Sequence, residues 1–509
     1  MRSRSSGRDS VCMVCVAVTC VVVAVWHLSL LFGRSYSSDF DIICEVSRRV
    51  AAGGKLYADA VDPRGPLMYA PMVFRWLTSP SWGAVFVRSV VLESLLSAVT
   101  VCLVARVVHE AHGDGEHVGS VVAIGCLAVV FLTGFVGAAE SETRVVPGCL
   151  VAVLLVLRER RGVPVRWWQW LLVGCFAGYT LWTKFPLCGV FVVILVYGIV
   201  VCGPARMARP FLLAMCGVAI VTIVALAIVM AFSDLPLVLS GYLFASGGGY
   251  LWRMLSGSFS ELTYGAVPLV VFKFVRWALG LCVGVFTFVC LVRRAGSLHG
   301  ALVWCCVALP VYGILLIPCP SYYREPLIAF VALAFGMGDW SLRRLSDGFH
   351  VGVMTAFVFL MVVAVIVGGL RCVAHVESLD DSRFSELVRR ETGGDDSVCA
   401  GYFGALWCMV DLGMETPYPT PAPNNSVGAF DQLESDVRYG RWRWVIWNFK
   451  QWYEEVPAEG ETVSFFGRDA VCAVVDRHGN ALLRLSDVDE GNLMHSRPIA
   501  WPDPWVPVA

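Results

Sequence analysis

SSDFDIICEVSRRVAAGGKLYADAVDPRGPLMYAPMVF, residues 37–74, is the stretch around which this chain is organised. It directly follows an apolar run, residues 11–32, and turns apolar again at its own end. A polar, acid-rich segment between two membrane spans has to lie in water or line a polar cavity, because bare charge in hydrocarbon is costly. The simplest interpretation is a solvated loop, since charge runs usually lie on solvated surfaces. The stretch carries five acidic residues within its first 26 positions, followed by an arginine: Asp39, Asp41, Glu45, Asp59, Asp62 and then Arg64.

The composition indicates a polytopic helical membrane protein. The 509 residues are 57% hydrophobic and 16% charged, and the mean hydropathy is +0.68. Soluble domains do not carry so many long apolar runs. The net charge of −1 gives no sign of a nucleic-acid partner. Most of the 20 cysteines lie in apolar runs and act there as small apolar side chains, whereas the sequence leaves open the disulfide state of Cys399, Cys408 and Cys472 in the polar tail.

Apolar runs of spanning length predict about eleven transmembrane helices. Three arginines precede the first run and place the N-terminus in the cytoplasm. Alternation from there puts at least one arginine in every predicted inner connection, in agreement with the positive-inside rule. The predicted spans are residues 11–32, 82–106, 118–138, 144–157, 167–183, 185–203, 210–232, 266–292, 300–317, 326–340 and 350–370.

The same alternation places the opening loop, residues 33–81, and the tail, residues 371–509, outside the cytoplasm. The tail is charged and rich in tryptophan, and we predict that it forms a small extracytoplasmic α/β domain. Its predicted elements are strands at 397–402 and 464–466, a helix at 441–455 and a hairpin at 472–485.

Polar residues from distant parts of the chain share the predicted outer face. Carboxylates gathered with cations at a membrane interface suit a lipid-linked phosphate donor, because a cation holds the phosphate while a carboxylate takes the acceptor's proton. Each residue also has a simpler role: acids mark a helix start, a lysine snorkels to the interface, and an isolated acid is usually solvated. The residues are Asp39, Asp41, Asp62, Arg64, Glu140, Glu142, Arg144, Lys184, Tyr322, Tyr323, Arg324 and Glu325.

Several short motifs occur in an order that is typical of one enzyme family. The opening loop shows an acid after the first span, a helical stretch ending in glycine, a Leu-Tyr pair and an Arg-Gly-Pro-Leu motif. This order resembles the GT-C glycosyltransferases of the dolichyl-phosphate-mannose protein mannosyltransferase and aminoarabinose transferase type. The motifs are Asp39, residues 45–54, 56–57 and 62–67, and further along residues 140–147, 178–184 and 322–326.

The resemblance covers about residues 11–370 and has two departures from the family's pattern. The acids after the first span read Asp-Phe-Asp rather than lying adjacent, and Arg-Gly-Pro at 64–66 stands where the family has Lys-Pro-Pro. Both departures concern the identity of the donor. Nothing in the tail identifies an acceptor.

The resemblance implies an all-α polytopic membrane protein with the GT-C fold. Residues 1–370 would form the transmembrane glycosyltransferase domain, with its catalytic outer loop at 33–81, and residues 371–509 the C-terminal domain. The implied reaction moves a sugar, with inversion, from a polyprenyl-phosphate donor to an envelope glycan, lipid or protein at the plasma membrane. Such enzymes often work without an obligatory metal, and a divalent cation is compatible with them.

The resemblance also assigns roles to the outer-face residues. Asp39 aligns with the family's acid and is the expected base, which takes the proton of the acceptor hydroxyl. Asp41, Glu140 and Glu142 are expected to orient the acceptor or share that role. The expected ligands of the donor phosphate, whose developing charge a cation stabilises, are Arg64, Lys184, Arg324 and Tyr323.

Two other classes of function remain as alternatives. A transporter or flippase of lipid-linked sugar would place its key charges within spans, and those charges are few: Arg88, Glu93 and Lys273. The absence of an evident internal repeat also weakens an inverted-repeat transporter. A non-catalytic envelope sensor would depend on the tail, whereas an enzyme would depend on Asp39.

Overall fold

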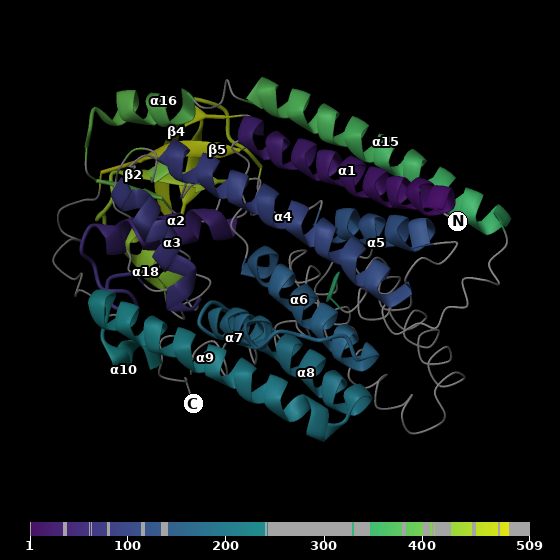
Figure 1. The fold of residues 1–509 in the computed structure, drawn as a ribbon. Helices are drawn as coiled ribbons and strands as arrows, with labels where there is room; N and C mark the ends of the chain where they lie inside the picture. The colour runs from purple at the N-terminus through teal and green to yellow at the C-terminus, as the bar shows by residue number, and fades with distance from the viewer. Residues whose placement is uncertain are drawn as a thin grey trace, which may run out of the picture. The chain divides into compact units, whose positions relative to one another are not determined.

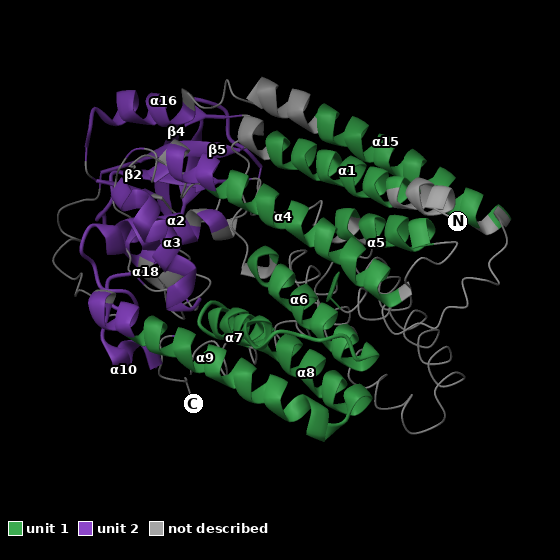
Figure 2. Ribbon diagram, viewed as in Figure 1, with its two compact units in different colours: residues 1–31, 89–226, 250–372 green, residues 32–88, 227–249, 373–509 purple. Residues whose placement is uncertain are grey.

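The structure of the chain is a computed structural model that divides into two compact units (Figure 2). The first unit comprises residues 1–31, 89–226 and 250–372, and the second comprises residues 32–88, 227–249 and 373–509. The opening loop and the tail therefore belong to the same unit. The structure describes residues 2–33, 38–60, 62, 64–78, 82–112, 118–133, 141–239, 242, 328–329, 347–378, 383–395, 397–400, 408–409, 412, 429–449, 455–476 and 479–487.

Apolar helices make up the first unit, because apolar runs of this length satisfy their backbone hydrogen bonds internally. Four of the described helices contain a stretch long and apolar enough to cross a membrane: Ser10–Ser29, Ala84–Ala111, Pro204–Ala231 and His350–Leu370. The helices are α1 (Arg2–Gly33), α4 (Trp82–His112), α5 (Val118–Thr133), α6 (Ser141–Arg161), α7 (Trp167–Leu181), the 3₁₀ turn η1 (Phe185–Leu187), α8 (Cys188–Cys202), α9 (Pro204–Phe232) and α15 (Asp347–Ser378) (Figure 1).

Helices coincide with eight of the predicted spans, those up to residue 232 and the one at 350–370. The predicted spans at 266–292 and 300–317 lie outside the described residues, and only two residues of the span at 326–340 are described. The total of about eleven spans therefore stays a prediction. Helices α1 and α15 lie side by side, and the Trp26 indole donates a 3.1 Å hydrogen bond to the Ala364 carbonyl (Figure 1).

Small residues let α7 and α9 approach at backbone distance. A Cβ added at Gly174 on α7 would lie 1.9 Å from the Ala214 carbonyl oxygen of α9. In the reverse direction, a Cβ at Gly217 would lie 2.2 Å from the Leu171 carbonyl oxygen. Such close crossings of small residues are how helices pack in a bilayer, where burial of apolar area gives no driving force between them.

The arginines of several predicted inner connections gather at one end of the first unit. Arg158 of α6 lies 3.4 Å from Glu110 near the end of α4, and Arg206 at the start of α9 lies 3.4 Å from Glu159 of α6. The Trp170 indole of α7 also donates to Glu159. The structure thus confirms that these connections lie together, while the side of the membrane that they face stays a prediction.

The opening loop of the second unit folds as two helices, α2 (Ser38–Ala51) and α3 (Pro66–Thr78). The helical stretch expected at residues 45–54 is confirmed up to Ala51, where α2 ends. The two helices pack on each other, and the Trp76 indole of α3 donates a 3.1 Å hydrogen bond to the Cys44 carbonyl of α2. The interpretation of the whole stretch as a solvated loop is wrong, because Glu45 and Asp62 are both 0% exposed, whereas Asp59 is exposed.

The tail contributes a five-stranded sheet to the second unit, in the order β1-β2-β5-β4-β3. Strand β1 is parallel to β2, and the other pairs are antiparallel. The elements are α16 (Arg383–Thr392), β1 (Val398–Ala400), α18 (Ala429–Arg438), β2 (Trp444–Asn448), β3 (Thr462–Phe465), β4 (Arg468–Val475) and β5 (Asn480–Leu485). The predicted strand at 397–402 and the hairpin at 472–485 are confirmed by β1 and by β4 with β5, and the strand predicted at 464–466 overlaps β3.

The helix predicted over 441–455 is wrong, because Trp444–Asn448 forms β2 between β1 and β5. Trp444 and Ile446 belong to the core cluster that also contains residues of α16. Val445 and Trp447 belong to the other cluster, which contains residues of α18. A strand covered on both faces reads as a continuous apolar run, which periodicity cannot distinguish from a buried helix.

Candidate functional site

The turn between α2 and α3 is closed by its own hydrogen bonds. The backbone N–H of Lys55 donates to the Asp59 carboxylate at 2.8 Å, and the Tyr57 N–H donates to the Ala60 carbonyl at 2.8 Å. Arg49 of α2 reaches the Asp59 carbonyl at 3.0 Å. Tyr57 adopts a left-handed backbone, with φ of 68°, which L residues with bulky side chains rarely adopt. The turn is therefore held in one defined conformation.

Two contacts attach this turn to the segment that follows α9, within the same unit. The Lys55 ammonium lies 3.0 Å from the Asp234 carboxylate, and both side chains are more than half exposed. The Ser233 hydroxyl donates to the Leu56 carbonyl and is buried. The buried hydrogen bond is the stronger constraint, because exposed ion pairs contribute little.

Arg64 is held by a buried carboxylate at the end of the same turn. Its Nη1 lies 2.8 Å from Oδ2 of Asp62, whose side chain is 0% exposed, and the Tyr69 hydroxyl of α3 donates to the same oxygen. The Tyr57 hydroxyl donates a 2.6 Å hydrogen bond to the Arg64 carbonyl. Arg64 is thus fixed through its side chain and through its backbone, with 11% of its side chain exposed.

Both tyrosines of this cluster, Tyr57 and Tyr69, act as hydrogen-bond donors. Burial, followed by the charge of Asp62, raises the pKa of Tyr69 well above its usual value. Burial also raises the pKa of Tyr57 well above its usual value, with smaller contributions from Tyr242 and Asp62. The two hydroxyls therefore stay protonated at neutral pH, as their hydrogen bonds to oxygen acceptors require.

A second buried carboxylate, Glu45, lies on α2 between two arginines. Its oxygens accept hydrogen bonds from Arg48 Nε at 2.9 Å and from Arg49 Nε at 2.8 Å. Burial by itself would raise the pKa of Glu45, but the two arginines outweigh it and lower this pKa below the usual value. Because Arg49 also binds the Asp59 carbonyl, Glu45 braces the turn that leads to Arg64.

The first unit contains its own polar cluster, which joins three helices. Glu93 of α4 lies 3.3 Å from Arg144 of α6, and Tyr179 of α7 is hydrogen-bonded to Arg144. The side chains of Glu93 and Arg144 are only 1% and 4% exposed. Glu93 therefore has an ion-pair partner, which removes most of the cost of placing a charge within a span.

Arg88, another of the mid-span charges, donates to the Thr78 hydroxyl at 3.0 Å, and Lys273 lies outside the described residues.

Lys184 follows α7 at the same end of the first unit as this cluster. Helices α6 and α7 are packed neighbours joined by the short connection 162–166, so the start of α6 and the end of α7 lie together. The Lys184 N–H donates to the Thr180 carbonyl at 2.9 Å, and the Lys184 carbonyl accepts from Leu187 of η1 at 3.0 Å. The half-buried lysine is thus fixed at its backbone beside the helix end.

The sequence-predicted site residues are described to different extents. Asp39 and Asp41 lie in the first turn of α2, and Glu142 lies in the first turn of α6. For these three residues the structure describes the backbone and not the side chain. Glu140, Tyr323 and Arg324 lie outside the described residues. Arg64 belongs to the second unit and Lys184 to the first. Among the described residues, no group of three or more His, Cys, Asp or Glu side chains could hold a metal ion.

Sequence reasoning gave no role to three tyrosines that hydrogen-bond to these residues: Tyr57 to the Arg64 carbonyl, Tyr69 to Asp62 and Tyr179 to Arg144. Tyr57 and Tyr179 stood in the family motifs without an assignment, and Tyr69 stood in an apolar run. The sequence does contain one indication of these contacts: Tyr57 precedes Asp62, and Tyr69 follows Arg64, at the same spacing along the chain. A tyrosine buried in a helical unit usually needs a partner for its hydroxyl, and the nearest charged motif is the natural candidate.

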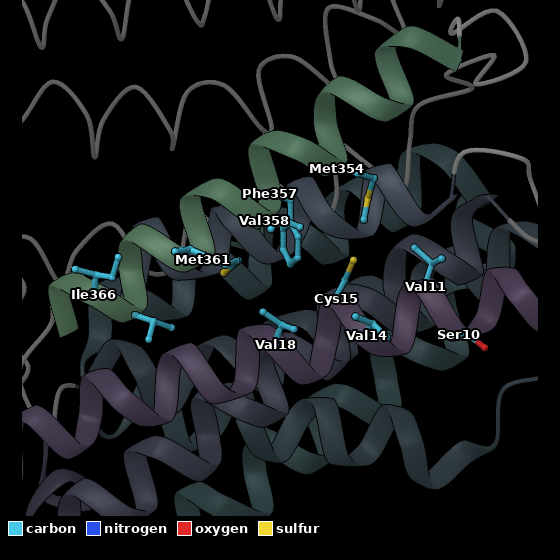
Figure 3. Close-up of a pocket in the computed structure, with 12 residues that line it drawn as sticks. Ser10, Val11, Val14, Cys15, Val18, Met354, Phe357, Val358, Met361 and Ile366 are labelled. Carbon is cyan, nitrogen blue, oxygen red and sulfur yellow. The ribbon is translucent and has the colours of Figure 1, made fainter. Parts of the chain in front are cut away.

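An apolar groove lies between α1 and α15 in the first unit (Figure 3). Its volume is about 560 Å³, and Val14, Val18, Phe357 and Met361 are among the residues that line it. None of the lining side chains is charged. The groove therefore offers surface to hydrocarbon and no ligand for a phosphate.

The fold is similar to that of ArnT from Cupriavidus metallidurans, whose crystal structure was determined with undecaprenyl phosphate bound. The TM-score is 0.56 at 12% sequence identity, and the match covers 92% of this chain and 97% of that chain. The chain thus has a fold of the GT-C type, similar to this aminoarabinose transferase. No protein-family model matches the sequence, and no curated protein matches it either.

Proposed function

We propose that this protein is a membrane glycosyltransferase that moves a sugar from a polyprenyl-phosphate donor to an extracytoplasmic acceptor. The observation that carries the proposal is the ArnT-like fold over 92% of the chain, together with a preformed turn that ends in Arg64 beside the buried Asp62. The acceptor would be an envelope glycan, lipid or protein. The N-terminus would lie in the cytoplasm and the C-terminal domain outside it.

The proposed reaction is a single displacement at the anomeric carbon. The acceptor oxygen forms a bond to that carbon as the bond to the phosphate oxygen breaks, which inverts the configuration. A carboxylate takes the proton of the acceptor hydroxyl, and the polyprenyl phosphate leaves as an anion that a cation stabilises. The reaction needs no redox cofactor, and a divalent cation would only assist the leaving phosphate.

Asp39 is the proposed base, with Asp41, Glu140 and Glu142 as acids that orient the acceptor. Asp39 lies in the first turn of α2, where the helix dipole favours an ionised carboxylate. Glu142 occupies the same position on α6. An ionised carboxylate is the form that a base requires.

Arg64 and Lys184 are the proposed ligands of the donor phosphate, with Tyr323 and Arg324 as further candidates. Arg64 supports this role because its guanidinium is fixed before any ligand arrives, and a fixed donor loses less entropy on binding. Lys184 supports it because it is half-buried and anchored at a helix end.

A transporter or flippase of lipid-linked sugar is the second candidate. Such a protein would use charges within its spans to line a polar path. The pairing of Glu93 with Arg144 favours the enzyme, because both side chains are buried against each other. A non-catalytic sensor would depend on the tail, and no described feature of the sheet favours one.

Binding and transfer assays with the full-length protein in lipid nanodiscs test the proposal. We expect undecaprenyl phosphate to bind more tightly than undecaprenol, which has the same chain but no phosphate. We also expect release of polyprenyl phosphate from a sugar-loaded donor when envelope acceptors are supplied. Equal binding of the alcohol and the phosphate would contradict the proposed donor. Movement of an intact donor from one leaflet to the other in proteoliposomes would support the transporter.

A further inference from the structure

Tyr57 combines a strained backbone with a buried side chain. Its φ of 68° lies in the left-handed region, and its side chain is only 3% exposed. Glycine adopts this backbone without strain, and Gly53 and Gly54 occur just before it in the same turn. Residues held in such conformations persist only where the surrounding structure determines them, and they cluster at functional sites.

The Tyr57 hydroxyl is directed at the residue proposed to bind phosphate. It donates a 2.6 Å hydrogen bond to the Arg64 carbonyl, seven residues further along the chain. Asp62 and Tyr69 hold the other end of Arg64, because Asp62 pairs with the guanidinium and Tyr69 donates to Asp62. The backbone and the side chain of Arg64 are therefore tethered by separate groups.

The strained backbone at Tyr57 is held in place by hydrogen bonds on both sides of its Cα. The Tyr57 N–H binds the Ala60 carbonyl at 2.8 Å, and the Leu56 carbonyl accepts from Ser233, so the backbone on both sides of the Cα is fixed. This geometry directs the ring inward, next to Tyr69 and Tyr242. A residue without the ring would adopt the same turn more easily but could not reach Arg64.

From this arrangement we infer that Tyr57 is a positioning residue for the donor phosphate, acting through Arg64. The Tyr57 hydroxyl fixes the position of the Arg64 backbone through its carbonyl. Asp62, held by Tyr69, fixes the orientation of the guanidinium. The inference rests on the proposed function, since it assumes that Arg64 meets the phosphate. It adds that a residue without contact to the donor determines donor affinity.

The experiment compares four proteins in nanodiscs by their dissociation constants for undecaprenyl phosphate and for undecaprenol: wild type, Tyr57→Phe, Arg64→Gln and the double variant. Tyr57→Phe keeps the ring and removes one hydrogen bond, so we expect a rise of about threefold to tenfold for the phosphate. The constant for undecaprenol should stay unchanged. The double variant should bind no more weakly than Arg64→Gln, because the effect of Tyr57 passes through Arg64.

Tyr197→Phe is the matched control, since Tyr197 is a buried tyrosine of α8 in the first unit. It should leave both dissociation constants unchanged. If Tyr57→Phe is too unstable to purify, Tyr69→Phe tests the second tether with the same expected result.

Three outcomes separate the inference from the function on which it rests. If Arg64→Gln weakens phosphate binding while Tyr57→Phe does not, the positioning role is wrong and the phosphate site stands. Additive effects in the double variant would mean that Tyr57 acts independently of Arg64, which also contradicts the inference. If Arg64→Gln has no effect, Arg64 is not a phosphate ligand, and the premise on which the inference rests is wrong.

Discussion

Glu93 of α4 and Arg144 of α6 form an ion pair of 3.3 Å in which both side chains are buried. Removing one partner of such a pair leaves an uncompensated charge and costs about 3–5 kcal/mol, whereas an apolar replacement of both is often neutral. We therefore expect Glu93→Leu to lower the thermal unfolding temperature strongly and Glu93→Leu with Arg144→Met to restore it. Thermal unfolding in detergent measures both. A double variant that folds well but no longer transfers sugar would give the pair a catalytic role.

Asp39→Asn should stop sugar transfer without unfolding the protein. Asn keeps the shape of Asp in the first turn of α2, so the stability should fall only by the charge–dipole contribution of about 0.3–1 kcal/mol. The amide cannot accept a proton, and the transfer rate should fall by roughly 100-fold or more, the scale for the loss of a general base. Binding of undecaprenyl phosphate should survive. Near-full activity would move the base to Asp41 or Glu142, and activity in Asp41→Asn and Glu142→Gln as well would end the glycosyltransferase assignment.

Arg64→Gln and Lys184→Gln should each weaken binding of the donor phosphate. The expected loss is about 1.5–3 kcal/mol, the usual scale for a hydrogen bond to a charged group. Titration with undecaprenyl phosphate measures it. Arg209→Gln is the control, because Arg209 is an exposed arginine in the second turn of α9 and is not a proposed phosphate ligand. Unchanged affinity in both test variants would move the phosphate site towards Arg324.

The stability of the opening loop should depend on pH through Glu45. The folded-state pKa of Glu45 lies below its usual value of 4.5. Burial by itself would raise this pKa, but the hydrogen bonds and charges of Arg48 and Arg49 lower it by more. A lowered folded-state pKa contributes stability above the unfolded-state pKa, and that contribution is lost as the pH falls through the folded-state pKa. Wild type should therefore lose more stability than Glu45→Gln as the pH falls below 4.5.

Thermal unfolding over this pH range measures the difference. Glu434→Gln is the matched control, since Glu434 pairs with Arg438 on the more exposed surface of α18. Identical pH profiles for wild type and Glu45→Gln would show that the carboxylate is not ionised in the fold.

Labelling of intact cells should reach the tail and not the arginine-rich end. We expect a membrane-impermeant maleimide to label Glu459→Cys, which lies at an exposed position before β3. Val163→Cys, between α6 and α7, should be labelled only after the membrane is opened, because arginines favour the cytoplasm. The opposite pattern would reverse the predicted topology. The native cysteines of the tail sheet are buried, which keeps the background low.

The sequence alone determined the positions of the described apolar helices and the grouping of their arginines. Both follow from properties of single residues, because the bilayer selects apolar runs of a fixed length and arginine favours one side. The order of the motifs also pointed to the GT-C fold, which the similarity to ArnT shows. The helical stretch of the opening-loop motif, residues 45–54, also anticipated most of the second half of α2.

Only the tertiary structure decided which groups meet. The run at Trp444–Asn448 became a strand because neighbours on both faces and both edges covered it, and a periodic pattern does not contain that information. Likewise, nothing local to Glu93 names Arg144, 51 residues away, as its partner. Nor does the sequence around Tyr57 reveal a left-handed backbone or a hydroxyl bonded to Arg64, because long-range packing fixes the turn and overrides the local preference for glycine.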